Sequence, residues 1–198
     1  MQEIILATGN KHKVEEIKAI LKDAPVNIIP MTSFENYPKV DENAPTLEGN
    51  AIKKAVTVAK FFNKWALADD TGLEVDFLGG APGVISAHYA GENATGLDNN
   101  KKLLTALNGV PFKKRTAAFK CVIAISSPEG KTYIANGEKN GIILEHFKGS
   151  GGFGYDGLFF TPELSKTFAE LSNEEKNKIS HRAQALAEAK KIIEKLNI

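Results

Sequence analysis

"QEIILATGNKHKVEEIKAIL", residues 2–21, predicts how the fold begins. Gln2–Ala7 is a short apolar run rich in isoleucine, which is typical of a buried strand. After the polar turn "TGNKHK", the apolar residues from Val14 to Leu21 repeat at helical spacing and predict one apolar helix face. Val26–Ile29 is the next apolar run. Because the helix would lie between two strands, this order favours a β-α-β unit with a parallel strand pair.

The rest of the chain continues to alternate between helices and strands. Thr46 is suited to cap a helix that runs to about Asn63, and Asp98 is expected to cap another. The other expected segments are a loop at 31–45, a short buried strand in "WALAD" (65–69) that ends at the aspartates, an antiparallel meander at 115–147, a glycine-rich loop at 149–157 that enters a strand, and helix at 172–196 with a break near Ser180. No linker or repeat interrupts the chain, so we expect an α/β fold in one domain, residues 1–198.

The composition is that of an ordinary globular protein. Of 198 residues, 42% are hydrophobic, and 25 Lys and Arg nearly cancel 24 Asp and Glu. A net charge of +1 does not suggest a nucleic-acid coat protein. The single cysteine, Cys121, lies in an apolar strand pattern, so we expect it in the core and expect a reducing compartment. No signal peptide or membrane span is predicted, and we expect a cytoplasmic protein.

The first candidate for chemistry is the turn "ATGNKHK". A glycine turn between a strand and a helix directs backbone N–H groups and the positive end of the helix dipole toward a ligand. Thr8, Asn10 and Lys13 add polar and cationic side chains, so the turn resembles a phosphate cradle, although it is not a Walker A loop. The structural alternative is a helix start that is capped by Asn10. This stretch alone favours neither.

The second candidate is a group of acids. Asp69 and Asp70 follow an apolar run, and either Asp41 or Glu42 is suited to supply another carboxylate. Mg²⁺ typically binds one or two carboxylates together with water and substrate phosphates. Neighbouring strand residues face opposite sides, so we do not expect Asp69 and Asp70 to face the same ligand. Taken alone, the pair favours the alternative of a solvated strand end.

The third candidate is "GSGGFGYDG", residues 149–157. Its glycines match the dinucleotide pattern G-x-G-x-x-G, but that pattern needs a helix to follow, and here a strand is predicted. We therefore interpret the segment as a loop in which Phe153 and Tyr155 stack on a base and Asp156 accepts a proton from a ring N–H. A glycine-rich hairpin with buried aromatic residues is the structural alternative, and it is favoured in isolation.

The fourth candidate is "EEKNKISHRAQAL". His181 and Arg182 lie where the last helix should begin, and Lys176 lies about one turn upstream. Donors of this kind suit a base carbonyl or a phosphate, whereas the alternative is capping by Ser180 with solvated charges. Together, a phosphate cradle, acids suited to a metal, a stacking loop and polar donors indicate a nucleoside phosphate site.

The sequence resembles the inosine/xanthosine triphosphate pyrophosphatase family. The resemblance rests on five blocks, which occur in the family's order over almost the whole chain: "LATGNKHKVEEI", "TLEGNAIKKA", "ADDTGLEVDFLGGAPGVISA", "GGFGYDGLFF" and "EEKNKISHRAQAL". It implies an elongated mixed β-sheet flanked by helices, two lobes with a nucleotide cleft between them, and a homodimer. It also implies Mg²⁺-dependent hydrolysis of ITP, dITP and XTP to the monophosphate and pyrophosphate, which removes deaminated purines from the nucleotide pool.

The resemblance also implies roles for individual residues. Asp70 would be the catalytic acid and, with Glu42, a metal ligand. The triphosphate would contact Thr8, Asn10, Lys13 and Lys54, and Gly9 and Thr71 would also contact the substrate. The base would be enclosed by Phe153, Gly154, Tyr155 and Asp156, and its oxygen edge would be recognised by Lys176, His181 and Arg182.

Two positions depart from the family pattern. His88 stands where bacterial relatives commonly have arginine, and Gly49 stands where many members have a second acid. Two other functions are kept as alternatives. One is a related pyrophosphatase that acts on pyrimidine or modified nucleotides, and the other is a nucleotide- or RNA-binding protein without turnover, for which Asp70 would be dispensable.

Overall fold

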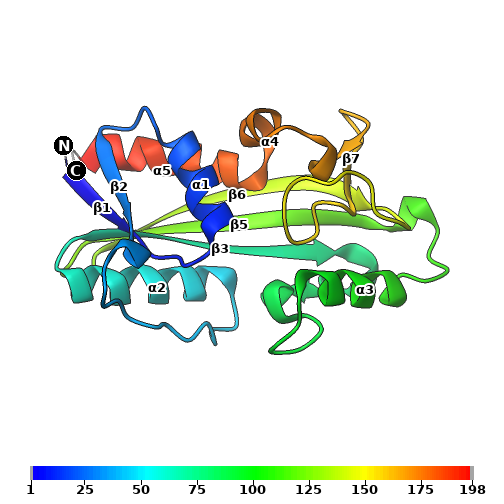
Figure 1. Cartoon of the computed structure of the whole chain (residues 1–198), viewed down its shortest axis with the longest axis horizontal. Helices are drawn as coiled ribbons and strands as arrows, with labels where there is room; N and C mark the ends of the chain where they lie inside the picture. The colour runs from blue at the N-terminus through cyan, green and yellow to red at the C-terminus, as the bar shows by residue number, and fades with distance from the viewer. Residues whose placement is uncertain (1, 197–198) are drawn as a thin grey trace. The chain divides into compact units, whose positions relative to one another are not determined.

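The computed structural model describes residues 2–196, and within them the chain forms two compact units (Figure 1). Unit 1 comprises residues 2–70, 121–137 and 181–196. Unit 2 comprises residues 71–120 and 138–180. Each unit is built from separated stretches of the chain, so no single linker divides them. The expectation of one domain stays a prediction.

The described strands form one mixed sheet in the order β2-β1-β3-β5-β6-β7-β8, with β4 paired to β3. The strands are β1 (Gln2–Leu6), β2 (Val26–Pro30), β3 (Trp65–Val75), β4 (Pro82–Gly83), β5 (Thr116–Ser126), β6 (Thr132–Ile143), β7 (Phe159–Thr161) and β8 (Lys166–Thr167). β1 pairs in parallel with β2 and β3, whereas β4, β7 and β8 pair antiparallel. The expected parallel pair and the mixed sheet flanked by helices are confirmed.

The helices follow the predicted periodicity closely. They are α1 (Lys11–Ile20), α2 (Leu47–Phe62), α3 (Gly96–Ala106), α4 (Asn173–Ile179) and α5 (His181–Leu196). Short 3₁₀ helices are η1 (Met31–Ser33), η2 (Asp76–Leu78), η3 (Ser86–His88), η4 (Phe112–Lys114) and η5 (Phe168–Glu170). Thr46 caps α2 by accepting from the Gly49 N–H at 3.0 Å, as predicted. The predicted break at Ser180 separates α4 from α5.

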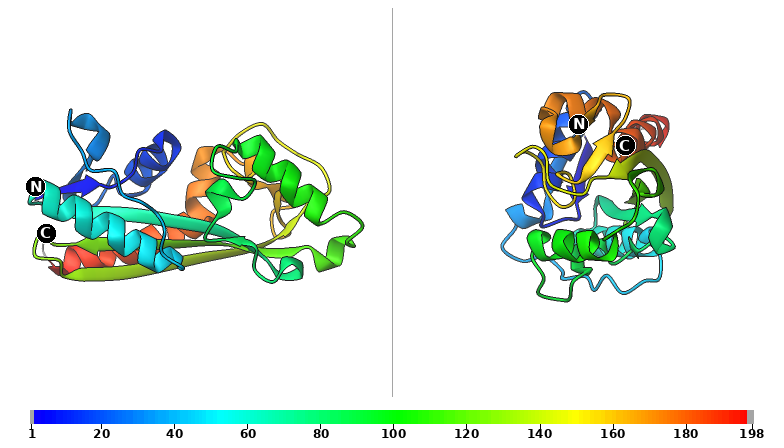
Figure 2. Two further views of the ribbon diagram at one scale, coloured as in Figure 1. Left: turned by 90° about the horizontal axis from the view of Figure 1, so that it is seen from below. Right: turned by 90° about the vertical axis from the view of Figure 1, so that its right-hand side faces the viewer.

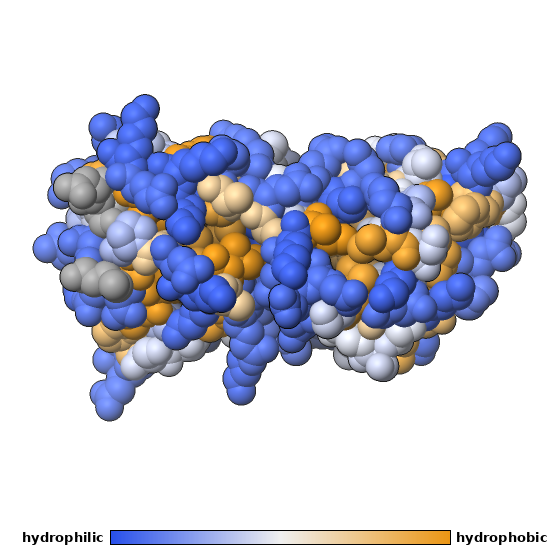
Figure 3. Space-filling view, turned by 90° about the horizontal axis from the view of Figure 1, so that it is seen from above, coloured by the Kyte–Doolittle hydropathy of each residue, from blue (hydrophilic) through white to orange (hydrophobic). Residues whose placement is uncertain are grey.

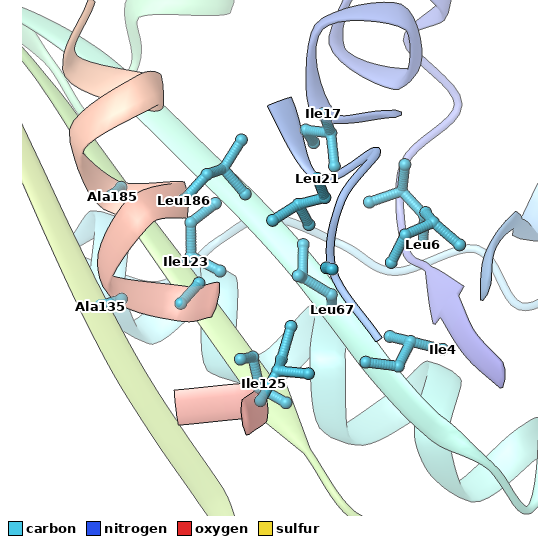
Figure 4. Close-up of a cluster of buried hydrophobic side chains, with 14 of the residues drawn as sticks. Ile4, Leu6, Ile17, Leu21, Leu67, Ile123, Ile125, Ala135, Ala185 and Leu186 are labelled. Carbon is cyan, nitrogen blue, oxygen red and sulfur yellow. The ribbon is translucent and has the colours of Figure 1, made fainter. Parts of the chain in front are cut away.

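Unit 1 has a sheet with helices on both faces. Alternate residues of β1 point to opposite sides because strand side chains alternate. Ile4 and Leu6 lie in a core with residues of α1 and α5, including Ile17 and Leu186 (Figure 4). Ile5 faces the other way, into a second core with the alanines of α2, which is cyan in Figure 2. Cys121 is buried in the first core, as expected.

Unit 2 has its own core around aromatic side chains. Phe119, Phe159 and Phe168 are mutually in contact, with ring centroids 4.6–5.9 Å apart, and leucines of α3 pack in the same cluster. The loop at 149–157 leads into β7, as predicted. The end of the glycine-rich loop packs into this aromatic cluster, because Tyr155 and Leu158 belong to the same core.

Three sequence predictions need correction. β3 does not end at the aspartates but continues to Val75, because both carboxylates are buried and paired rather than solvated. Thr95, not Asp98, caps α3, and Asp98 completes a capping box by accepting from the Thr95 N–H at 2.9 Å. The antiparallel meander expected at 115–147 consists of two strands, β5 and β6, because β6 passes through Gly137 and Gly141 without a turn.

The face shown in Figure 3 is largely hydrophilic, with hydrophobic residues visible between the charged ones. None of the helices in the described part of the chain combines the length and the apolarity needed to cross a bilayer.

Candidate active site

The turn between β1 and α1 is an Asn-capped helix start. The Asn10 Oδ1 atom accepts from the N–H groups of His12 and Lys13 at 3.0 and 3.3 Å, and the Asn10 N–H donates to Thr8 Oγ1 at 3.2 Å. The capping alternative is therefore confirmed. Gly9 and Asn10 remain exposed, so the cap leaves the turn open to solvent, and its phosphate role stays a prediction.

The two adjacent aspartates of β3 face opposite sides of the sheet, as predicted. Asp70 faces α2, where its Oδ1 atom accepts from Lys54 Nζ at 2.8 Å. Lys54 also donates to Glu42 Oε2 at 2.6 Å and to the backbone oxygen of Asp69 at 2.8 Å. One ammonium group thus joins two carboxylates, from the loop before α2 and from β3. Lys54 and Asp70 are buried, at 8% and 6% exposed, whereas the Glu42 side chain is 43% exposed, so the cluster opens to solvent on the side of Glu42.

Asp69 lies on the other side, within a buried ion network. Its Oδ1 atom forms an ion pair with Lys13, and its Oδ2 atom accepts from Arg182 Nε at 2.8 Å and from the Cys121 thiol at 3.1 Å. Arg182 NH1 forms a further ion pair with Glu16 of α1. Asp69 and Arg182 are both 0% exposed. The network joins α1, β3, β5 and α5 of unit 1.

The electrostatics of the Lys54 cluster distinguish its two carboxylates. Burial raises the pKa of Asp70 to about 6, although the positive charge of Lys54 acts in the opposite direction. Burial also acts to raise the pKa of Glu42, but the charge and hydrogen bond of Lys54 outweigh it, so this pKa is below its ordinary value. Asp70 is therefore the carboxylate that gains and loses its proton near neutral pH, as a general base requires.

The Lys54 cluster contains two carboxylates, Glu42 and Asp70, both of which are paired with the lysine. Mg²⁺ is usually bound by one or two carboxylates, with water and phosphate oxygens completing the octahedron. Glu42 and Asp70 contact the same ammonium group, so their oxygens lie close enough to share a cation. Within residues 2–196 no group of three His, Cys, Asp or Glu side chains is arranged to hold a metal. Of the two candidates in the loop, it is Glu42 that accepts from Lys54.

A second polar cluster lies in unit 2. Lys176 Nζ donates to Asp156 Oδ2 at 2.7 Å, and both side chains are buried. The same ammonium lies 4.8 Å from the ring centroid of Phe153, in a cation–π contact. Asp156 also accepts from the Phe153 N–H at 2.9 Å, which fixes the loop. Gly152 has φ of +72°, and a Cβ there would collide with the Asp156 carboxylate, so this position requires glycine.

Tyr155 lies in the core of unit 2. It is 4% exposed, and its hydroxyl donates to the backbone oxygen of Ser86 at 2.8 Å. Burial raises its pKa above the ordinary value. Nearby, Asn100 of α3 donates to the backbone oxygen of Gly154 at 2.8 Å. Tyr155 and Asn100 thus hold the loop from inside, so Phe153 is better placed than Tyr155 to stack on a ligand.

The remaining predicted residues lie in different units. Thr71 is a half-buried residue of β3 in unit 2. His181 is the first residue of α5 in unit 1 and is 3% exposed. The structure therefore groups the predicted phosphate and metal residues in unit 1. It groups Phe153, Asp156 and Lys176 in unit 2, whereas His181 and Arg182 belong with unit 1.

Sequence reasoning missed several supporting residues. Glu16 was not singled out, although it lies three residues after Lys13 and therefore on the same helix face. Asn100 and Ser86 carried no visible signal, because Asn100 donates to the backbone oxygen of Gly154 and Ser86 accepts from the Tyr155 hydroxyl through its own backbone oxygen, both across long sequence separations. Asp69 was recognised as an acid, but its partners come from three other elements and no local pattern predicts them.

The two residues that depart from the family pattern, Gly49 and His88, have different surroundings. A Cβ at Gly49 would lie 2.8 Å from the Ala44 methyl group, so the loop before α2 packs closely against this glycine. His88 lies on the exposed end of η3.

Comparison with known proteins identifies the family. The sequence profile of the Ham1 family matches residues 4–192. The dITP/XTP pyrophosphatase of Desulforamulus reducens is 50% identical over 196 residues, which covers 99% of this chain and 98% of that protein. The structure of a HAM1 protein from Coxiella burnetii has a TM-score of 0.89 at 41% identity and covers 98% of this chain and 100% of that one.

A third relative is similar at lower identity. The crystal structure of a nucleoside-triphosphatase / dITP/XTP pyrophosphatase from Mycobacterium abscessus has a TM-score of 0.75 at 35% identity, covering 94% of this chain and 97% of that one. The matches extend over nearly the full length of each protein. The chain belongs to the Ham1 family, which confirms the resemblance seen in the sequence.

Proposed function

We propose that this protein hydrolyses deaminated purine nucleoside triphosphates (ITP, dITP and XTP) to the monophosphate and pyrophosphate, with Mg²⁺ as cofactor. The observation that carries the proposal is the cluster in which buried Lys54 joins buried Asp70 to the exposed Glu42. The printed names of relatives that are about half identical over almost the whole chain support the substrate class.

The residues of unit 1 have the chemistry for cleavage at the α-phosphorus. Lys13 and Lys54 neutralise charge on the phosphate oxygens, and the turn at Thr8–Asn10 offers polar contacts. Asp70, with a pKa of about 6, is ionised at pH 7 and orients and deprotonates the attacking water. Glu42 and Asp70 are the residues that would hold Mg²⁺. When bound, this ion supplies polarisation of the phosphoryl oxygens.

The residues of unit 2 have the chemistry for recognising the base. Phe153 offers a ring for stacking, and Lys176 offers a buried donor to the 6-oxo group of hypoxanthine or xanthine. Adenine carries an amino group at this position, so a donor aimed there would be left unpaired, which costs more than a lost contact. Guanine keeps the 6-oxo group, and its exclusion must depend on its 2-amino group.

A purified-protein assay tests the proposal. The protein is incubated with Mg²⁺ and ITP, dITP, XTP, GTP, ATP, TTP or UTP, and pyrophosphate is resolved from orthophosphate. We expect pyrophosphate mainly from ITP, dITP and XTP. Preference for TTP or UTP would replace the proposal by the pyrimidine alternative, orthophosphate would mean that another bond is cleaved, and no metal-dependent release would favour a binding protein.

The matched variant is Asp70→Asn, which keeps the shape of the side chain. Removing a general base or metal ligand should lower kcat by at least about 100-fold. The fold should persist, because Lys54 keeps its contacts with Glu42 and the Asp69 backbone. Near-normal turnover in Asp70→Asn would contradict the role of Asp70. Circular dichroism and thermal melting confirm that a loss of turnover is not a loss of structure.

The homodimer that the resemblance implies also stays part of this proposal. No nucleic acid or membrane is proposed as a partner, in line with the near-neutral net charge.

A further inference from the structure

Asn100 is a buried amide of α3 that reaches the glycine-rich loop. The residue is 3% exposed, and its Nδ2 atom donates to the backbone oxygen of Gly96 at 2.6 Å and to that of Gly154 at 2.8 Å. Gly96 lies one turn earlier in the same helix, whereas Gly154 lies 54 residues further along the chain. Both amide hydrogens are therefore used, one within the helix and one on the loop.

The oxygen of the same amide has no such partner. Among the residues that the structure describes, no group donates a hydrogen bond to Asn100 Oδ1, although this atom is buried. Turning the amide over would place Oδ1 against two backbone oxygens and would take both acceptors from Nδ2. A buried acceptor without a donor lowers the stability of the fold. An apolar side chain of similar size would avoid this cost, so local packing does not explain an asparagine here.

The bond from Asn100 fixes the tip of the glycine-rich loop. Gly154 is exposed and has φ of +62°, and a Cβ there would meet nothing within 4 Å, so side-chain packing does not hold this residue. It directly follows Phe153, whose ring centroid lies 4.8 Å from the Lys176 ammonium. A glycine next to the ring gives the backbone additional freedom, and the hydrogen bond from a buried donor restricts it.

Asn99, the preceding residue, has a different pattern of contacts. It is 4% exposed, its Oδ1 atom accepts from the Ala90 N–H at 2.7 Å, and its Nδ2 atom donates to the Ala87 oxygen at 3.0 Å. This amide is bonded at both atoms, and it fixes residues 87–90. The two neighbouring asparagines of α3 thus hold two different segments of unit 2.

We propose that Asn100 is a positioning residue for recognition of the base. Its amide holds Gly154, and thereby the neighbouring Phe153 ring beside Lys176, in the arrangement that stacks on a purine. Fixing the ring before the ligand arrives strengthens binding, because less freedom is then lost on association. The assignment rests on the proposed function, because it takes the Phe153, Asp156 and Lys176 cluster as the base site.

The test compares Asn100→Leu with the unmodified protein by calorimetry, using two ligands that divide the nucleotide between them. Deoxyinosine monophosphate carries the base, and inorganic pyrophosphate with Mg²⁺ does not. We expect the Kd for the monophosphate to rise at least about fivefold and the Kd for pyrophosphate to stay within about twofold. An unchanged Kd for the monophosphate in folded Asn100→Leu would overturn the proposal, and so would equal weakening of both ligands.

Thermal melting distinguishes positioning from a purely structural role. If Asn100 only stabilised the fold, its loss would lower the Tm together with binding. We expect the Tm of Asn100→Leu to be no lower than that of the unmodified protein. The buried unpaired oxygen is then gone, and Gly154 is exposed, so water can replace the lost donor. A much lower Tm together with weaker monophosphate binding would return Asn100 to a structural role.

Asn99→Leu is the matched control, because it removes an equally buried amide from the same helix. We expect it to lower the Tm, since both atoms of this amide have partners, and to leave monophosphate binding within about twofold. Equal weakening in the two leucine variants would mean that disturbance of α3 causes the effect, which would overturn the proposal. If Asn100→Leu does not fold, Asn100→Ala carries the comparison, because it removes the amide without adding apolar volume.

The design also separates this proposal from the proposed function, because both titrations measure binding and not turnover. Release of no pyrophosphate from any nucleotide would refute the proposed hydrolysis, whereas the titrations would still decide the role of Asn100. If the unmodified protein did not bind deoxyinosine monophosphate, the base site and the role of Asn100 would both be overturned. Folding of each variant is checked by circular dichroism before titration.

Discussion

Asp69 and Asp70 are adjacent in the sequence, yet their environments shift their pKa values in opposite directions. Asp69 is fully buried, and burial alone would raise its pKa, but Arg182 and Lys13 lower it well below the ordinary value. Asp70 is buried beside Lys54, and in its case burial prevails. One aspartate is thus permanently charged and structural, whereas the other can exchange a proton near neutral pH.

The raised pKa of Asp70 predicts an acid limb in the activity profile. Between about pH 4 and 6 an ordinary aspartate is ionised, whereas Asp70 is protonated and can neither accept a proton nor bind a cation. We therefore expect kcat/KM to fall about tenfold per pH unit below pH 6. The limb should move to lower pH as Mg²⁺ is raised, because the metal competes with the proton.

Steady-state kinetics between pH 4.5 and 8 at two Mg²⁺ concentrations would measure this limb. Circular dichroism at each pH serves as the control, since acid unfolding would give the same loss of activity. A flat profile down to pH 5 in folded protein would contradict the assignment of Asp70 as the base.

Helices and strands were predictable from the sequence where their apolar residues repeat at a regular spacing. The start of the chain, α2 with its Thr46 cap, and the break at Ser180 all follow from local patterns. The end of β3 does not follow from a local pattern, because the sequence shows the two charged aspartates but not the residues that pair with them. Lys13, Lys54 and Arg182 come from three different helices and neutralise the pair, so the strand continues through it.

The candidate site was predictable as a set of residue types and not as an arrangement. Alternation along β3 predicted that the aspartates separate, and this was correct. Which lysine pairs with which aspartate depends on packing between distant segments, and so does the burial of Tyr155 against Ser86. The pairing of Arg182 with Asp69, 113 residues away, has no local signal.

The glycine-rich loop allows a test at the scale of one element. Gly152→Ala should displace the Asp156 carboxylate and break its pair with Lys176, because the new Cβ would occupy its position. We expect kcat/KM for dITP to fall at least about tenfold, with pyrophosphate binding unchanged.

The control for Gly152→Ala is Gly109→Ala, measured by the same kinetics and titration. Gly109 has φ of +74°, similar to that of Gly152, but a Cβ there meets nothing within 4 Å. Gly109→Ala therefore has the same cost of about 1 kcal/mol for an unfavourable backbone conformation as Gly152→Ala, but the new Cβ collides with no other atom. If both variants lose activity equally, the cost of the backbone conformation accounts for the loss and the position of Asp156 does not.

At the scale of the whole molecule, the exposed apolar side chains are unevenly divided between the units. The large ones in the described residues are Tyr37, Phe61, Phe77, Ile85, Leu97, Phe112, Phe147 and Leu164. Six of these eight belong to unit 2. If the chain forms the proposed homodimer, unit 2 has more apolar surface to bury in it.

We therefore expect the mass of two chains by light scattering at micromolar concentration. Leu97→Asp in unit 2 should shift the protein toward the mass of one chain, because a charge at an apolar contact opposes its burial. Phe61→Asp, at an equally exposed position in unit 1, is the matched control and should not. A single-chain mass for the unmodified protein would contradict the homodimer.

The division of the chain into interleaved segments has a consequence for its synthesis. Residues 71–120 and 138–180 make up unit 2, and all of them have been added once the ribosome passes residue 180. Unit 1 then still lacks α5, whose Leu186 and Ile193 belong to its first core, and Arg182, the partner of Asp69. The unit that begins the chain is therefore the last to be completed during translation, and until then its buried acid has no guanidinium to neutralise it.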